Sequence, residues 1–392
     1  MEIIKDGIYQ MVDKKDMVPE ALKIRNFYDM VPDAPIIQRP FGFLCYEAWA
    51  EAGHMTLDED ATVEGSRLFN LFGFDKSGKY ILQGLGWCEA GLCPIFDEQI
   101  VEDRGKYEVV IDPAGRHVLL FKGRKHGFMP EYLDHPVKDR KTWEEQIKWR
   151  MDPKTPERYV DFDKQMQEGK IAAAQGKAIA QHLVGGYMYL RSLMGPEDLL
   201  YQFYDNPDLI HECMQTWLEL ADGVIAKYQQ HLTIDEVFIA EDICYNCASL
   251  ISHDMIREFL FPYYQQLLTN IKRRNLDKNR PFYFQVDTDG KAETVIDVYK
   301  EIGMNYMSPF EVASGSDVVA IAKKYPDLLM GGGIDKRILA QGPEAIDRHL
   351  DYIMPYMKKR GGYIPTCDHM VPAEVSFENY MHYRKRMLEY AK

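Results

Sequence analysis

The chain has no long apolar run, no excess of basic residues and few cysteines, and each absence excludes a class of protein. No apolar run reaches the ~18 residues that a membrane-spanning helix needs, so a membrane is not an expected partner. The 47 Lys and Arg residues are outnumbered by 61 Asp and Glu residues, which gives a net charge of −14. Phosphate backbones bind to basic surfaces, so nucleic acid is not an expected partner either.

The seven cysteines are odd in number and scattered through 392 residues, which does not suit a disulfide framework. The first residues also lack the apolar core of a secretory signal, so we expect a cytoplasmic protein in a reducing compartment. Cys244 and Cys247 have the spacing of redox and zinc motifs, but no second pair follows to complete a zinc ribbon.

What the chain does contain is a repeated alternation of strand-like and helix-like segments. This repetition is typical of a parallel α/β barrel, so we predict a TIM (β/α)8 barrel over residues 35–392, after a helical lead-in over residues 1–34. Strands are expected at 35–44, 178–186, 235–240, 281–286, 304–310, 328–333 and 362–366.

The pattern changes between residues 77 and 135. Residues 107–121 form two alternating segments around a Pro-Ala-Gly turn, which predicts a β-hairpin. We expect residues 77–135 to be an insertion near the N-terminus that folds over the mouth of the barrel.

Polar side chains follow the predicted strands, at the place where the catalytic groups of such barrels lie. Thiolate, imidazole and carboxylate all bind Zn²⁺, and ligands from separate strand ends can meet at one point. The alternative is that acidic strand ends only cap the next helix. The predicted metal ligands are Asp287, Glu311, Cys367 and His369.

Two further carboxylates, Glu241 and Asp289, are predicted to orient the substrate or deliver a proton. Glu241 is followed by Asp242. Because adjacent strand residues point to opposite sides, only one of this pair can face the lumen. The sequence leaves open which one does.

The C-terminal segment resembles a known family. Residues 361–372, with the sequence Gly-Gly-Tyr-Ile-Pro-Thr-Cys-Asp-His-Met-Val-Pro, are similar to the C-terminal signature of the uroporphyrinogen decarboxylase superfamily. The spacing from His369 to Glu378 and Asn379 matches that signature, although Cys-Asp-His replaces its Gly-His-Gly turn. The resemblance is clearest over residues 180–392 and implies a TIM barrel with its site at the mouth.

Two departures separate the chain from the true decarboxylases. These bind a polyanionic tetrapyrrole with an N-terminal arginine cluster, whereas the matching stretch here, residues 39–49, has only Arg39. The resemblance therefore favours the corrinoid-dependent methyltransferase branch, whose zinc site is His-x-Cys with a later Cys. Here the pair reads Gln285-Val-Asp287 and the later position falls at His369, which shifts the implied ligands from sulfur towards carboxylate and imidazole.

Within that branch, residues 286–290, 309–311 and 333–336 look most like the methyltransferase component of anaerobic O-demethylase systems. The resemblance implies Zn²⁺ as a cofactor and an aryl methyl ether as the small methylated substrate. Phenolate is a better leaving group than hydroxide, and a metal or a positioned acid would improve it further. The chain has no Asp-x-His-x-x-Gly corrinoid motif, so the cobalamin would arrive on a separate corrinoid protein.

The substrate itself is expected to contact one cation and several aromatic rings. Other aromatic candidates for the barrel mouth are Trp49, Phe128 and Tyr189. A uroporphyrinogen decarboxylase-like decarboxylase and a non-catalytic barrel that binds a ligand or corrinoid protein remain alternatives, and a homodimer is left open. The predicted substrate-binding residues are Arg39, Tyr46, Tyr187 and Phe310.

Overall fold

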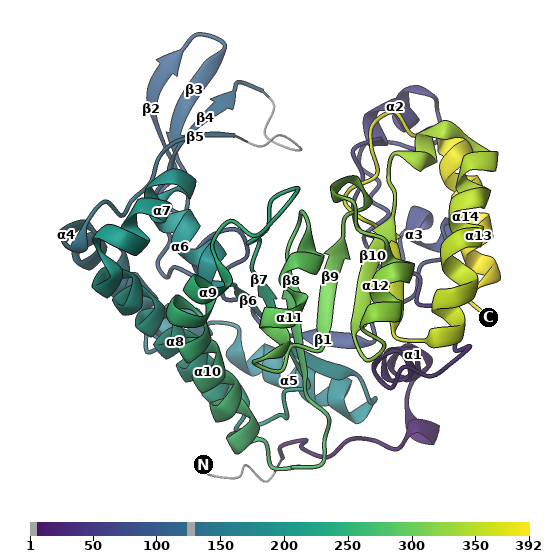
Figure 1. Ribbon diagram of the computed structural model, residues 1–392, viewed down its shortest axis with the longest axis horizontal. Coiled ribbons are helices and arrows are strands. Elements are labelled where there is room, and N and C mark those ends of the chain that lie inside the picture. The colour runs from purple at the N-terminus through teal and green to yellow at the C-terminus, as the bar shows by residue number, and fades with distance from the viewer. Residues whose placement is uncertain (1–5, 124–129) are drawn as a thin grey trace.

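The computed structural model describes residues 6–123 and 130–392 (Figure 1). Its centre is a seven-stranded sheet in the order β1-β6-β7-β8-β9-β10-β11, in which each neighbouring pair is parallel. The sheet curves into a half-barrel, so the expected parallel α/β architecture is present. Its strands are β1 (Lys79–Ile81), β6 (Ala178–Val184), β7 (Glu236–Ala240), β8 (Tyr283–Asp287), β9 (Tyr306–Phe310), β10 (Leu329–Ile334) and β11 (Tyr363–Cys367).

Helices connect successive strands and cover the outer face of the sheet (Figure 1). Parallel strands need such crossovers, and each helix buries an apolar face against the sheet. In α8, for example, the Trp217 indole packs in the core and donates a hydrogen bond of 2.9 Å to the carbonyl of Val184 on β6. The connecting helices are α5 (Phe162–Ala174), α6 (Gly186–Met194), α7 (Pro196–Asp205), α8 (Pro207–Tyr228), α9 (His253–Phe259), α10 (Phe261–Arg274), α11 (Ile296–Lys300), α12 (Val318–Lys324) and α13 (Pro343–Arg360), and α14 (Phe377–Glu389) follows the last strand.

The segment expected to form the first barrel strand, residues 35–44, is not a strand. It contributes a single parallel bridge, between Phe43 and Val371 after β11. Its other end is tied to the entry of β1, where the Gln38 amide donates to the Asp75 carboxylate at 2.8 Å. The segment therefore fills the seam between β1 and β11 without a hydrogen-bonded ladder. Pro35 and Pro40 explain this, because proline has no amide donor to continue one.

The amino-terminal end of the sheet is sealed by α1 (Pro19–Tyr28), the helix expected in the lead-in. The Tyr28 ring stacks on Tyr283 with 3.8 Å between centroids, and its hydroxyl donates to Glu236 at 2.7 Å. Arg25 forms a buried ion pair with Asp235 at 3.2 Å. The same helix contributes Glu20, Lys23 and Ile24 to the lining of the cavity inside the sheet.

A second sheet is built from antiparallel strands β2 (Gln99–Arg104), β3 (Tyr107–Ile111), β4 (His117–Phe121) and β5 (Glu131–Asp134). The two segments expected to pair at 107–121 are β3 and β4. Figure 1 shows this sheet standing apart from the parallel sheet, above α6 and α7. The boundary expected for an insertion at residue 77 is too early, because β1 belongs to the parallel sheet. Phe128, expected at the mouth, lies outside the described residues.

No helix of the described residues is at once long enough and apolar enough to cross a membrane.

Candidate active site

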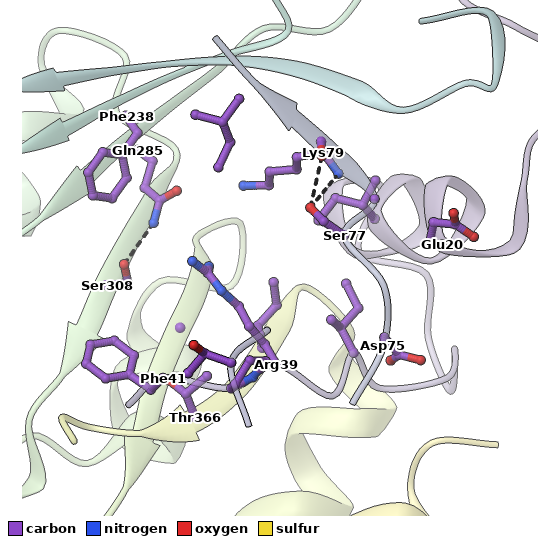
Figure 2. A pocket seen from close by; sticks show the side chains of 18 of the residues that line it. Glu20, Arg39, Phe41, Asp75, Ser77, Lys79, Phe238, Gln285, Ser308 and Thr366 are labelled. Atoms are coloured by element: carbon purple, nitrogen blue, oxygen red, sulfur yellow. Dashed lines mark hydrogen bonds between the residues drawn. The ribbon is translucent and has the colours of Figure 1, made fainter. Parts of the chain in front are cut away.

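A cavity of ≈ 280 Å³ lies inside the curve of the parallel sheet (Figure 2). Alternate strand residues point to the same face, and the inward-facing set builds the wall. Gly331 and Gly332 of β10 also line the cavity, and without side chains they leave space opposite Ser308. The inward-facing residues from the other strands are Lys79, Ile81, His182, Phe238, Gln285, Asp287, Tyr306, Ser308, Ile364 and Thr366.

Asp287, the last residue of β8, is the carboxyl group of the cavity that comes from a strand end. The Ser308 hydroxyl donates to Asp287 Oδ2 at 3.0 Å, and the Gln285 amide donates to the Ser308 hydroxyl at 2.8 Å. Burial, reinforced by the negative charge of Asp289, raises the pKa of Asp287 to about 8. At neutral pH this side chain is therefore mainly a carboxylic acid, which can give a proton to a neighbouring atom.

Two cations, Arg39 and Lys79, extend into the cavity from different sides (Figure 2). The Lys79 ammonium is neutralised by the buried Glu236 carboxylate, with 2.6 Å between Nζ and Oε1. Arg39, from the seam segment, forms no ion pair with any described residue. With Asp287 protonated, the centre of the cavity carries the uncompensated charge of Arg39, which favours an anionic or electron-rich ligand group there.

Above the cavity, the loops that follow the strands form a charged rim. His369 Nε2 lies 3.8 Å from Asp289 Oδ2, and Lys336 Nζ lies 3.6 Å from Glu311 Oε1. Burial, followed by the charge of Asp242, raises the pKa of Asp289 to about 7. Burial also lowers the pKa of His369, so its imidazole is neutral at pH 7. The Phe41 ring connects rim and cavity, with its centroid 5.7 Å from that of His369.

Glu311 and Asp368 of this rim also hold the loops in place. Glu311 accepts a 2.7 Å hydrogen bond from the Gly290 amide, and Asp368 accepts a 2.8 Å bond from the Val312 amide. Glu311 thus ties the end of β9 to the loop after the neighbouring β8, and Asp368 ties the end of β11 to the loop after β9, across β10. These hydrogen bonds hold the rim loops in place above the cavity.

The structure does not bring Cys367 to the cavity. Its neighbour Thr366 faces the lumen, so Cys367 points outwards, where it is buried beside Tyr380 and Tyr383 of α14. Burial raises the pKa of the Cys367 thiol to about 12, so it is protonated rather than a thiolate. Cys367 is close to His369 in the sequence, but it does not lie beside His369 at the site because its side chain points to the outer face of the strand.

Glu241 is also absent from the cavity lining. It lies on the outer side of β7, where it accepts a hydrogen bond of 2.9 Å from the Tyr187 amide at the start of α6 and another from the Tyr264 hydroxyl. Burial raises the pKa of Glu241 to about 7. Asp242 turns to the rim instead and pairs with Arg191. Of this adjacent pair, Asp242 is therefore the residue on the side of the site.

The aromatic residues expected to contact a substrate are mostly core residues. Tyr187 and Phe310 are fully buried outside the cavity, as are Trp49 and Tyr189. Tyr46 hydrogen bonds to Asp60 at 3.1 Å and stays behind the seam segment. The rings that do line the cavity are Phe41, Phe69, Trp87, His182, Phe238 and Tyr306.

Sequence reasoning missed most of these rings. Alternation along β7 and β8 places Phe238 and Gln285 on the same face as Asp287, so that signal was available. Nothing local marks Trp87, which reaches the cavity from a loop after β1.

The predicted metal ligands were tested against this geometry. Asp287 is in the cavity, Glu311 and His369 are on the rim, and Cys367 is on the outer face. The described residues contain no group of three or more His, Cys, Asp or Glu side chains placed to hold one ion. The predicted four-residue set therefore does not fit a single zinc ion in this arrangement.

Comparison with known proteins identifies the family. The sequence model of uroporphyrinogen decarboxylase (URO-D) matches residues 177–390, more than half of the chain. The chain belongs to the URO-D family. The matched region runs from the start of β6 to the end of α14 and includes the whole rim. The search of curated proteins found no match.

One solved structure resembles the chain over nearly its full length, and a second resembles part of it. A methyltransferase from Methanosarcina mazei superposes with a TM-score of 0.57 and 12% identity, covering 95% of this chain and 99% of that one. A Listeria monocytogenes protein described as a vitamin-B12 independent methionine synthase gives 0.32 and 9% identity, covering 59% of this chain and 68% of that one. The first likeness supports the fold, and the second is too weak to support an argument.

Proposed function

We propose that this URO-D family protein is a methyltransferase that takes a methyl group from a small methylated compound. An aryl methyl ether is the favoured donor, and the acceptor is the cobalt of a corrinoid carried by a separate protein. The observation that carries the proposal is the buried carboxyl group of Asp287, held by Ser308 in a small cavity with aromatic walls, where burial raises its pKa to about 8. The full-length likeness to a methyltransferase fold supports it.

The chemistry assigned to this geometry is acid-assisted methyl transfer. The O–CH₃ bond breaks, the methyl group leaves towards the acceptor, and the bonding electron pair stays on the oxygen. Asp287 gives its proton to that oxygen, so a neutral phenol forms in place of a phenolate. Asp287 becomes a carboxylate, stabilised by the Ser308 hydroxyl and by Arg39, and regains a proton from solvent before the next turnover. A reduced corrinoid, when docked, supplies the electron-rich cobalt that accepts the methyl group.

Cavity size and charge favour this reaction over porphyrinogen decarboxylation. Small-molecule sites usually measure ~300–1,000 Å³, and ≈ 280 Å³ suits a single ring better than a tetrapyrrole. A polycarboxylate also needs several cations. Of the four basic residues in the cavity lining, Lys79 is already neutralised and Lys23 is paired with Asp75 at 2.7 Å, which leaves Arg39 and Lys76. The family match nevertheless makes a decarboxylase of a smaller acid the second candidate.

Zinc dependence remains a separate proposal, since the resemblance implies it and the predicted ligands do not converge. Metal analysis of the purified protein tests it directly. A stoichiometric zinc ion would require the rim side chains, Asp289 and His369 first, to move towards Asp287.

The central experiment incubates the purified protein with cob(I)alamin, as a free stand-in for the corrinoid protein, and a panel of methoxyarenes. We expect formation of methylcobalamin and of the matching phenol in equal amounts. Asp287→Asn should lower the rate by roughly 10²–10⁴-fold, because an amide cannot supply the proton. The matched control is Asp317→Asn, at the N-cap of α12, where asparagine caps equally well.

The same samples separate the alternatives. Carbon dioxide release from a carboxylated substrate, without methyl transfer, would establish the decarboxylase. Ligand binding with neither product would indicate a non-catalytic barrel. Equal methylcobalamin formation by wild type and Asp287→Asn would remove Asp287 from the mechanism.

A further inference from the structure

One wall of the cavity carries a cluster of three flat rings. The Trp87 indole lies parallel to the Phe238 ring, with 5.1 Å between centroids and 12° between planes. His182, the cross-strand neighbour of Phe238, lies beside this pair, with its centroid 4.5 Å from Phe238 and 6.3 Å from Trp87. Burial lowers the pKa of His182 to about 4, so it is a neutral ring at physiological pH. The cluster is built from β6, β7 and the loop after β1, and Trp87 is the ring that comes from the loop.

The outer face of Trp87 is open. Although one face rests on Phe238, Trp87 keeps 47% of its surface exposed and lines the cavity. A large exposed indole costs hydrophobic free energy unless something covers it, and aromatic rings stack well on such faces. The free face points to a ligand that is itself flat and apolar.

The backbone holds this indole rigidly. Leu85 forms a parallel bridge with Leu183 of β6, and Gly86 then pairs with Ala90 across a tight turn. Gly86 has φ +86°, and a Cβ there would collide with the carbonyl oxygen of Glu89, so the turn requires glycine. Trp87 thus sits at the tip of a turn anchored to the barrel. Such a preorganised ring loses little conformational entropy when a ligand binds.

We propose that Trp87 is the specificity-determining residue of the site, and that it selects aromatic methyl donors by stacking the substrate ring on its free face. The proposal rests on the proposed function in that the ligand is a methyl donor. It goes further by assigning the preference for a ring to one residue outside the predicted site. The ring would lie parallel to Phe238, and the side chains of Asp287 and Arg39 would meet its substituents.

Binding measurements test this without requiring turnover. Isothermal titration would compare 1,2-dimethoxybenzene with methoxycyclohexane, an ether of similar size that has no flat ring. Trp87→Ala should weaken the arene by roughly tenfold and change the cyclohexyl ether by less than about twofold. Trp87→Phe keeps a stacking ring and should retain arene affinity within about threefold. This variant allows the test to be made even if Trp87→Ala unfolds.

The matched control is Trp149→Phe. Trp149 is equally exposed, at 50%, but rests on Arg150 and does not line the cavity. Arene binding should quench tryptophan fluorescence in the wild type and in Trp149→Phe, and should leave it unchanged in Trp87→Phe. The inference is overturned if Trp87→Ala weakens both ethers equally, or if the Trp87→Phe protein is quenched as much as the wild type.

These outcomes differ from failure of the proposed function. Selective, Trp87-dependent arene binding without methyl transfer would refute the methyltransferase and leave the ring-recognition site standing. Methyl transfer that is unaffected by substitution of Trp87 would support the methyltransferase and refute the ring-recognition site.

Discussion

Replacing the buried Glu241 by glutamine should stabilise this protein at alkaline pH and have little effect at acidic pH. Glu241 has none of its surface exposed and lies between β7 and the start of α6. Its pKa is raised from 4.5 to about 7, mainly by burial. Glutamine has the shape and hydrogen-bonding capacity of the protonated acid but no charge to bury.

The size of the effect follows from proton linkage. A carboxyl group whose folded-state pKa is raised contributes full stability below its unfolded pKa and loses it as pH rises through the folded pKa. The window is therefore pH 4.5 to about 7. A shift of this size corresponds to about 3 kcal/mol, since one pKa unit is worth ~1.4 kcal/mol. Asp287 and Asp289 titrate in both proteins, so their contributions cancel in the comparison.

The assay is urea unfolding of wild type and Glu241→Gln at pH 4.5 and pH 8.5. We expect nearly equal free energies of unfolding at pH 4.5 and an advantage for Glu241→Gln of up to about 3 kcal/mol at pH 8.5. A difference between the proteins that is the same at both pH values would refute the reasoning. The turnover of Glu241→Gln should stay within about threefold of wild type, because Glu241 does not line the cavity.

Three further predictions concern the candidate site. The rate of methyl transfer should be independent of pH below about 8 and fall roughly tenfold per pH unit above it. The reason is that the raised pKa of Asp287 keeps this proton donor protonated only below that value, and a pH–rate profile checks the prediction. Arg39→Met should weaken 4-methoxybenzoate by roughly tenfold and leave neutral anisole within about twofold in titration calorimetry, since Arg39 extends into the cavity without an ion-pair partner among the described residues. Cys367→Ala should leave bound metal and turnover unchanged, as measured by metal analysis and the methylcobalamin assay, because its thiol faces α14; loss of either would return Cys367 to the site.

Much of the fold could be predicted from local pattern. β7 to β11 lie where apolar runs end in a polar residue, because strands buried on both faces must be continuously apolar while their ends reach solvent. The split between α7 and α8 falls at Asn206-Pro207 because proline begins a helix and cannot continue one. The seam segment was harder to predict, since its apolar residues resemble a strand and only its two prolines argue against a ladder.

The site was predictable only in part, and the reason is geometric. Asp287 follows from its strand end and its inward position. Glu241 and Cys367 have the same sequence signal, but each points to the outer face of the sheet, where burial makes it a packing residue.

The sequence by itself determined the order of strands and helices, the family signature and the acidic strand ends, because these depend on neighbouring residues. Only the tertiary structure decided which polar residue faces the lumen, since a shift of one position reverses the direction of a strand side chain. It also placed Trp87 at the cavity. Trp87 lies in an irregular segment, whose path is set by packing against the completed sheet and not by any local periodicity.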